Sequence, residues 1–226
     1  MDGALEDIRI ISFDAEGTLA SHAFSRTIWQ EAVPSLYGER RGLAYEDAAA
    51  KVYAEYATIG PDRREWYDIG YWFERLGLGE PEPVIESHRV LIELYPDVRP
   101  ALEALDGRYQ LVVASSTPLE FLRPLLRDVE SSFSHVFSST SACGRLKDAE
   151  FFRWMCGQLD ARPSEIVHVG DHPVRDYESA RAAGIAAFQL DRSGRRDCSI
   201  RSLMELVHRL AGSQSGGKPA GGCDAP

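Results

Sequence analysis

Five short apolar runs recur along the chain, at residues 8–13, 111–114, 136–138, 166–169 and 186–190. Each run has the length and composition of a buried strand, and small or polar residues follow it. Between the later runs, apolar residues recur at helical spacing over residues 118–129, 149–159 and 176–183. Strands that alternate with helices predict an α/β fold with a Rossmann-like, doubly wound parallel sheet.

More than 90 residues separate the first apolar run from the second, far more than one crossover helix needs. Three sets of apolar positions in this interval have helical spacing: Trp29, Val33 and Leu36; Trp66, Ile69, Phe73 and Leu76; Val84, His88, Leu91 and Tyr95. Turn formers at residues 38–42, 60–61 and 77–83 separate them. We therefore expect a lid of about four helices, with Trp66 and Trp72 in its core and Tyr67 and Tyr71 exposed.

The last periodic stretch predicts one more amphipathic helix, built on Ile200, Leu203, Met204, Val207 and Leu210. Beyond it, residues 212–226 are dominated by Gly, Ser, Pro and Ala, a composition typical of disorder. The expected organisation is a core of residues 1–20 and 96–211, a helical cap of residues 21–95 and a disordered tail of residues 212–226.

Composition narrows the class of protein. The chain has 226 residues, a formal charge of -10 and a pI near 5.1, which disfavours nucleic-acid binding because that depends on basic side chains. Acidic residues stand where a signal peptide has basic ones, and no apolar run has membrane-spanning length. The four cysteines form no CxxC pair. We expect a cytoplasmic protein with reduced thiols and neither nucleic-acid nor membrane partners.

Polar side chains follow four of the predicted strands at the point where each strand ends. In parallel sheets this edge is where ligands bind. The side chains are Asp14 and Glu16 with Gly17 and Thr18, the hydroxyl run Ser115-Ser116-Thr117, then Lys147, and finally Asp171 and Asp176.

Lys147 is unusual for this chain, which has 22 arginines and only three lysines. The other two, Lys51 and Lys218, fall in the expected lid and tail. Because a compact ammonium binds phosphate as a point charge where a guanidinium fork is too wide, a lysine here suggests a chemical requirement.

Together these motifs resemble the haloacid dehalogenase (HAD) superfamily. Its DxDGT-like, Ser/Thr, Lys and GDxxxxD-like motifs correspond here to Asp14-Ala15-Glu16-Gly17-Thr18, Ser115, Lys147 and Gly170-Asp171 to Asp176. The insertion is similar to the family's C1 cap. The segments 95–100 and 176–184 further resemble small C1-capped phosphatases.

The resemblance implies a Mg²⁺-dependent phosphatase in which Asp14 is the nucleophile and forms an aspartyl-phosphate. It places Mg²⁺ on the Asp14 carboxylate, the Glu16 main-chain carbonyl and Asp171. Other implied roles are phosphate binding by Lys147 and by Ser115 or Ser116, orientation of Lys147 or a metal-bound water by Asp176, and a tight turn at Gly17 and Thr18. We favour Ser115 over Ser116 because it directly follows the strand. The expected substrate is a small phosphorylated metabolite, and the expected state is a monomer or homodimer.

Glu16 leaves three interpretations open, because most similar phosphatases carry Asp there as the general acid. In the first, Glu16 serves a repositioned active site like that of the enolase-phosphatases of methionine salvage, which the chain resembles in having DxEGT and paired serines. Alternatively, Glu16 is a slower acid in an ordinary small-molecule phosphatase, or the protein is a non-catalytic binder of phosphorylated ligands. Dehalogenation is disfavoured, because three converging acids require a cation. For His22 and His172 we expect packing or solvent-facing roles, and Arg63 and Arg64 are candidates for a substrate anion.

Overall fold

A five-stranded parallel sheet forms the centre of the computed structural model, which describes residues 7–196 and 199–214. The strands are β1 (Ile10–Phe13), β2 (Gln110–Ser115), β3 (His135–Ser138), β4 (Ile166–Gly170) and β5 (Ala186–Gln189), in the spatial order β3-β2-β1-β4-β5. β1 is central, with Ile10 paired to Gln110 on one side and Ile166 on the other. The α/β prediction is confirmed, and each predicted strand lies within two residues of an observed one.

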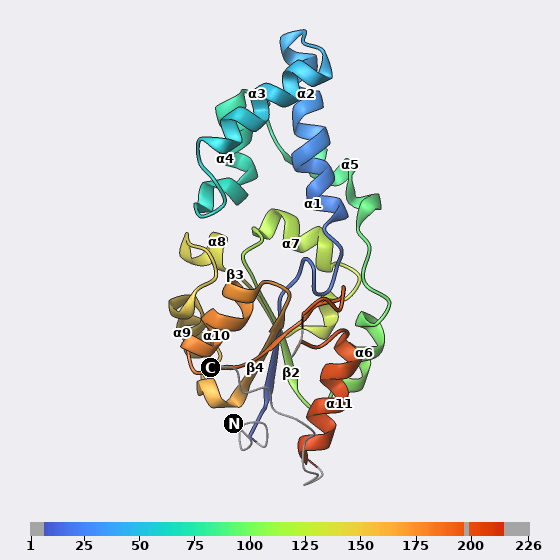
Figure 1. Cartoon of the computed structure of the whole chain (residues 1–226), viewed down its shortest axis with the longest axis vertical. Coiled ribbons are helices and arrows are strands. Elements are labelled where there is room, and N and C mark those ends of the chain that lie inside the picture. The colour runs from blue at the N-terminus through green and yellow to red at the C-terminus, as the bar shows by residue number, and fades with distance from the viewer. Residues whose placement is uncertain (1–6, 197–198, 215–226) are drawn as a thin grey trace.

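Helices cover both faces of the sheet, as Figure 1 shows. Side chains alternate between the faces along β1: Ile11 and Phe13 join a cluster with helices α6 (Val98–Leu105), α7 (Leu119–Leu126) and α11 (Leu203–Gln214). Ile10 joins the opposite cluster, with helices α9 (Ala149–Gln158) and α10 (Ser179–Ala182). Burial on both faces explains why the strands read as continuous apolar runs.

The insertion after β1 is helical, as predicted. One continuous helix comprises α1 (Ala23–Thr27), a π-helical segment η1 (Ile28–Ala32) and α2 (Val33–Arg41), and Gly42 ends it in the left-handed conformation. It is followed by α3 (Tyr45–Ala57), the 3₁₀ turn η2 (Arg64–Tyr67), α4 (Ile69–Leu76), α5 (Glu82–Ser87) and the 3₁₀ turn η3 (Arg89–Leu91). Figure 1 shows these elements as a separate helical layer beyond one end of the sheet.

Two helix predictions in the insertion were too long. Trp66 lies in η2 rather than in α4, because Asp68 caps α4 by accepting a hydrogen bond from the Tyr71 N–H at 2.9 Å. The helical pattern over residues 84–95 ends at Ser87. Beyond η3 the chain is extended and forms an antiparallel bridge between Ala20 and Leu94, so these returning residues pair with the outgoing chain instead of coiling.

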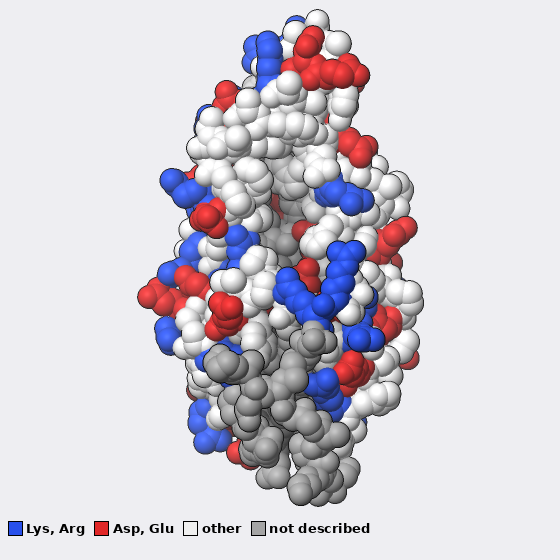
Figure 2. All heavy atoms as spheres, viewed as in Figure 1, with Lys and Arg blue, Asp and Glu red and all other residues white. Residues whose placement is uncertain are grey.

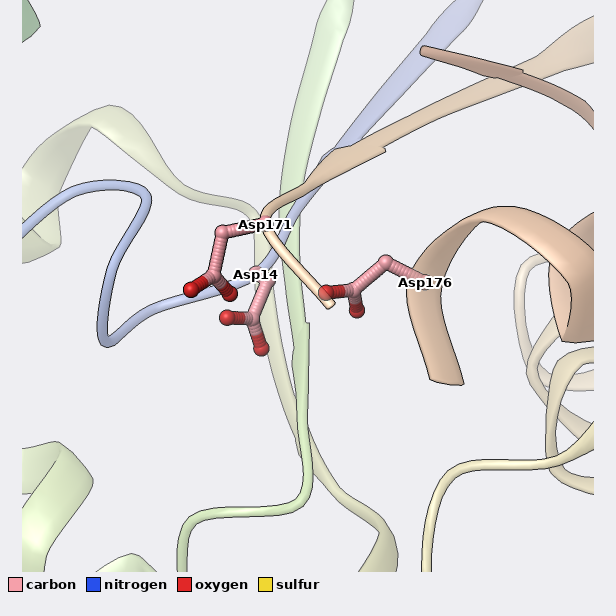
Figure 3. Close-up of side chains that lie close together, drawn as sticks. All are labelled: Asp14, Asp171 and Asp176. Carbon is pink, nitrogen blue, oxygen red and sulfur yellow. The ribbon is translucent and has the colours of Figure 1, made fainter. Parts of the chain in front are cut away.

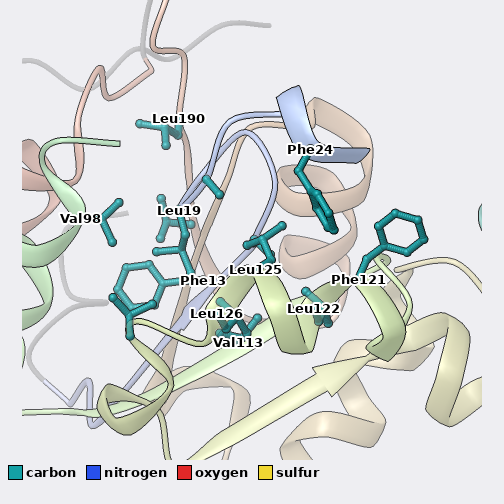
Figure 4. Packing of buried hydrophobic residues seen from close by; sticks show 14 of the residues in the cluster. Phe13, Leu19, Phe24, Val98, Val113, Phe121, Leu122, Leu125, Leu126 and Leu190 are labelled. Atoms are coloured by element: carbon teal, nitrogen blue, oxygen red, sulfur yellow. The ribbon is translucent and has the colours of Figure 1, made fainter. Parts of the chain in front are cut away.

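The helical insertion contacts the core through aromatic side chains. Phe24 on α1 lies edge-on to Phe121 on α7, with ring centroids 5.6 Å apart (Figure 4). Trp29 stacks on the same Phe121 ring at 5.7 Å. Both phenylalanines are about 1% exposed, so one apolar cluster continues from the sheet into the insertion.

Three further elements complete the chain: η4 (Glu130–Ser132) before β3, α8 (Ser139–Cys143) directly after it, and η5 (Pro163–Glu165) before β4. A π-helical turn η6 (Pro173–Glu178) precedes α10. Helix α11 continues to Gln214, three residues into the tail expected to be disordered, and residues 215–226 of that tail lie outside the described residues. None of the helices in the described part has the length and hydropathy needed to cross a membrane.

Candidate active site

The first acid of the site lies at the end of the central strand. Asp14 directly follows β1, and its N–H donates to the Val169 carbonyl of β4 at 2.9 Å. The turn after it needs Gly17, which has φ +81° and lies against Asp171: a Cβ at this position would be 2.3 Å from Asp171 Oδ2. Thr18 is buried, and its carbonyl accepts a 2.7 Å hydrogen bond from Arg192.

Lys147 is buried between the acids of two strand ends. Its ammonium donates to Asp14 Oδ1 at 2.6 Å and to the Ala114 carbonyl at 3.0 Å, and it pairs with Asp176. The three side chains are each less than a tenth exposed. An ammonium with three acceptors within reach is held in one place. The short helix α8 and the turn after it bring residue 147 back to the sheet, where these acceptors lie.

Burial and charge act against each other in this cluster. Burial raises the pKa of Asp14 to about 7, while Lys147 acts in the opposite direction. Burial also opposes ionisation of Asp176, but the attraction of Lys147 and a hydrogen bond from His168 leave its pKa below the usual range. The pKa of Lys147 is raised, because Asp14 and Asp176 outweigh its desolvation. Lys147 and Asp176 therefore form a buried ion pair beside Asp14.

Three carboxylates from two strand ends converge on one point (Figure 3). Asp14, Asp171 and Asp176 each offer an oxygen within 4.8 Å of the others. An all-oxygen set with several negative charges suits a hard divalent cation such as Mg²⁺. The residues present therefore fit a magnesium ion.

Glu16 and the hydroxyl run after β2 meet at the same edge. Thr117 Oγ1 donates to Glu16 Oε2 at 3.2 Å, and Ser115 Oγ donates to Thr117 Oγ1 at 3.2 Å. Burial raises the pKa of Glu16, and the hydroxyls of Ser25 and Thr117 offset part of that rise. A carboxyl that holds its proton more tightly is suited to donating one near neutral pH.

Ser116 has a different role from its neighbour. Its Oγ accepts the Lys147 N–H at 3.0 Å, so this hydroxyl fixes the lysine backbone. Ser115 and Ser116 both line the cavity, and which of them binds phosphate through its hydroxyl stays a prediction.

His168 and Ser12 support Asp176 from behind the site. His168 is fully buried, with Nε2 at 3.2 Å from Asp176 Oδ1 and Nδ1 at 2.8 Å from Ser12 Oγ. Burial lowers the pKa of His168. A neutral ring with its proton on Nε2 therefore donates to Asp176 and accepts from Ser12.

A cavity of about 790 Å³ opens above the carboxylates, between the core and the helical insertion. Figure 2 shows this hollow on the surface, with acidic side chains inside it. Its floor carries the predicted residues Asp14, Glu16, Ser115, Ser116, Lys147, Asp171 and Asp176. Its opposite wall is aromatic, formed by Trp29, Tyr53, Tyr56, Trp66 and Tyr67, with Arg26 and Gln30 beside them.

Sequence reasoning missed most of this wall, because its aromatic members come from three separate elements, η1, α3 and η2. Trp66 and Tyr67 line the cavity, whereas Trp72 is core as expected. Arg175 was missed although it lies inside the GDxxxxD motif: it donates to the Tyr67 hydroxyl at 2.5 Å and to the Pro61 carbonyl at 2.9 Å.

The two histidines expected to have packing or solvent-facing roles, His22 and His172, both line the cavity. His22 Nε2 lies 3.6 Å from Asp171 Oδ2, and that contact raises the pKa of His22. His172 caps η6 by accepting from the Val174 and Arg175 N–H groups. Arg63 and Arg64, in contrast, pair with Glu65 and Asp68 outside the cavity.

Comparison with known proteins gives three informative relatives. The GMP/IMP nucleotidase YrfG of Escherichia coli (strain K12) is 29% identical over 117 residues, 51% of this chain and 52% of the relative. The chain therefore matches about half the length of this curated relative. A HAD phosphatase from Thermococcus onnurineus is 25% identical, with a TM-score of 0.80 over 91% of this chain and 99% of that one.

The HAD-hydrolase YfnB of Bacillus subtilis, whose structure has magnesium bound, shares the fold at 18% identity, with a TM-score of 0.62 over 90% of this chain and 99% of that one. The sequence model of the haloacid dehalogenase-like hydrolases matches residues 8–184, a range that runs from β1 through the insertion and past the last motif to the end of α10. With the parallel sheet, the helical insertion after β1 and the four polar strand ends, this match shows that the chain belongs to the haloacid dehalogenase-like hydrolases.

Proposed function

We propose that the protein is a Mg²⁺-dependent phosphomonoester hydrolase that acts on a small phosphorylated metabolite. The observation that carries this proposal is the buried contact between Asp14 and Lys147, with Asp171 and Asp176 beside it. A binding module has no need of a carboxylate nucleophile held against a phosphate-binding ammonium at the bottom of a cavity.

Each residue has a chemical role in this proposal. One Asp14 oxygen attacks phosphorus in line, and the resulting aspartyl-phosphate is then hydrolysed by water. Lys147 and a hydroxyl of Ser115 or Ser116 bind the phosphoryl oxygens, where charge is redistributed in the transition state. Asp14, Asp171 and the Glu16 carbonyl would hold Mg²⁺, with Asp176 orienting Lys147. The bound ion supplies positive charge that lets the anionic ester approach the carboxylates.

Glu16 is the proposed general acid. It protonates the leaving oxygen as the P–O bond breaks, and in the second step it takes a proton from the attacking water. Such a group contributes typically about 10²–10⁴-fold to the rate.

Nucleoside monophosphates are the substrate class we propose to test first. The E. coli relative is named for action on GMP and IMP. The aromatic wall also supports a planar leaving group, because a base stacked on an aromatic side chain gains about 1–3 kcal/mol. The alternative hypothesis, an enolase-phosphatase, is supported by DxEGT and the paired serines. None of the relatives described above favours it.

The decisive experiment measures phosphate release from a panel of nucleoside monophosphates, sugar phosphates and enol phosphates with Mg²⁺. Asp14→Asn removes the nucleophile but keeps the shape, so turnover should fall to background. Asp128→Asn, on an exposed acid away from the cavity, is the matched control. Full activity in Asp14→Asn would overturn the proposal, as would ligand binding without release by the wild-type protein. Chelation by EDTA should abolish release, and added Mg²⁺ should restore it.

A further inference from the structure

Glu16 presents a geometric problem for a general acid. It has one methylene more than the aspartate usual at this position, and therefore one more rotatable bond to fix. A displacement near 1 Å can cost about 100-fold in rate. Its backbone lies in the turn three residues beyond the end of β1, so the carboxyl needs a partner from elsewhere in the chain.

Thr117 is that partner in the structure. Its Oγ1 donates to Glu16 Oε2 at 3.2 Å across 101 positions of sequence. The other carboxyl oxygen, Oε1, is buried and accepts no hydrogen bond of normal geometry among the described residues, although the Ser25 hydroxyl also acts on the carboxyl and offsets part of the rise in its pKa. Thr117 therefore provides the one hydrogen bond of defined geometry that fixes the carboxyl among these residues.

The direction of this hydrogen bond is set by Ser115. Ser115 Oγ accepts the Thr117 N–H at 3.2 Å and donates its own proton to Thr117 Oγ1 at 3.2 Å. A hydroxyl has a single proton to give. With one acceptor position filled by Ser115, the Thr117 proton points to Glu16.

Thr117 is also held to the sheet. Ser138, the last residue of β3, donates its hydroxyl to the Thr117 carbonyl at 2.9 Å. Pro118 follows at once and restricts the Thr117 backbone to extended conformations. The donor is therefore anchored independently of Glu16.

We infer that Thr117 is the positioning residue that fits a glutamate to the general-acid role. The inference rests on the proposed phosphatase function. In the step concerned, an Asp14 oxygen bonds to phosphorus and the bond from phosphorus to the leaving oxygen breaks. The electron pair of that bond stays on the leaving oxygen, which takes the Glu16 proton. Thr117 keeps the carboxyl in place for this transfer and does not itself react.

The test uses two aryl esters that differ in their need for protonation. p-Nitrophenolate leaves readily without a proton, whereas phenolate leaves poorly. Thr117→Val removes the hydroxyl and keeps the shape. We expect kcat/KM, which reports the steps through leaving-group departure, to fall about 10- to 100-fold for phenyl phosphate and by less than about threefold for p-nitrophenyl phosphate. Thr117→Ser should restore the phenyl phosphate rate.

Thr140→Val is the matched control. Thr140 supports the same loop by donating to the Ser116 carbonyl at 2.9 Å, and it forms no hydrogen bond to Glu16. Its loss should affect both esters equally. Equal losses in Thr117→Val would overturn the inference and would instead mean that Thr117 binds phosphate.

A double-mutant cycle tests whether Thr117 acts through Glu16. In a Glu16→Gln background the acid is gone, so Thr117→Val should produce no further loss on phenyl phosphate. Additive losses would show that Thr117 acts elsewhere. A wild-type protein inactive on every ester would contradict the proposed function itself, whereas an active one with a silent Thr117→Val contradicts only this inference.

Discussion

Gly17 illustrates how one residue constrains the site. Its positive φ and its contact with Asp171 both exclude a side chain, the first by backbone sterics and the second by direct overlap. A DxEGT segment alone indicates a tight turn. Only the structure shows that the glycine also makes room for a carboxylate from β4.

Gly17→Ala should therefore cost both stability and activity. The left-handed backbone costs about 1–2 kcal/mol with any Cβ. Displacement of Asp171 should lower kcat at least tenfold and raise the Mg²⁺ concentration needed for half-maximal rate. Gly42→Ala is the control, because Gly42 has φ +64° but no atom within 4 Å of its absent Cβ. It should lose similar stability with unchanged activity, and an active Gly17→Ala would contradict the placement of Asp171.

At the level of residues, sequence identified the floor of the cavity and missed its wall. Asp14, Lys147 and Asp171 were predictable because each follows a strand that the apolar pattern reveals. The hydroxyl run was equally visible. The contact between Thr117 and Glu16 could not be predicted, since it depends on how far the loops after β1 and β2 each extend beyond the sheet.

At the scale of elements, the loop between β4 and α10 has two functions. It carries Asp171 and Asp176, and between them Arg175 reaches the insertion through Tyr67 and Pro61. The Arg175 guanidinium also lies over the Tyr67 ring, 5.2 Å from its centroid. The carboxylate-bearing loop and the wall of the cavity are therefore directly connected.

Arg175→Gln should weaken substrate binding more than it slows the reaction. Hydrogen bonds from a charged donor contribute about 1.5–3 kcal/mol, less where water competes, as it does at this half-buried side chain. We expect KM to rise about tenfold and kcat to change less than about threefold in steady-state assays. Arg181→Gln is the control, because Arg181 contacts Tyr177 in the same way, on the surface and without reaching the insertion. A loss confined to kcat would place Arg175 in the chemistry instead.

A cluster of charged side chains around Glu165 stabilises the whole molecule at the edge of the sheet where the strands begin, opposite the cavity. Glu165, just before β4, accepts the Arg162 N–H at 2.8 Å and bonds the Arg162 and Arg9 side chains. These contacts lower its pKa to about 2. Because the folded pKa is depressed, the stabilisation is complete above the unfolded value near 4.5 and is lost as the pH falls toward about 2.

Glu165→Gln should consequently be less stable than wild type at pH 7, with the difference shrinking between about pH 4.5 and pH 2. Urea unfolding at several pH values measures this directly. A difference in unfolding free energy that stays constant with pH would show that the ionised carboxylate is not the stabilising species.

The architecture was more predictable than the site as a whole. Buried parallel strands leave a strong apolar signal, so all five strands, and helices such as α9, were visible in the pattern. The insertion was correctly predicted as helical, but residues 92–95 belong to a pattern of helical spacing and yet have an extended backbone. There the pairing of Ala20 with Leu94 overrides local preference, and no local pattern reveals a partner more than 70 positions away.

That bridge has a consequence for how such a chain can change. Since the bridge holds the outgoing and returning chain together at Ala20 and Leu94, any segment placed between these two residues must only bring its own ends together. The entropy of doing so grows slowly, by about 0.6 kcal/mol for each doubling of length. Evolution or design can therefore exchange the substrate-facing wall for a shorter or longer one while the reactive floor keeps its geometry.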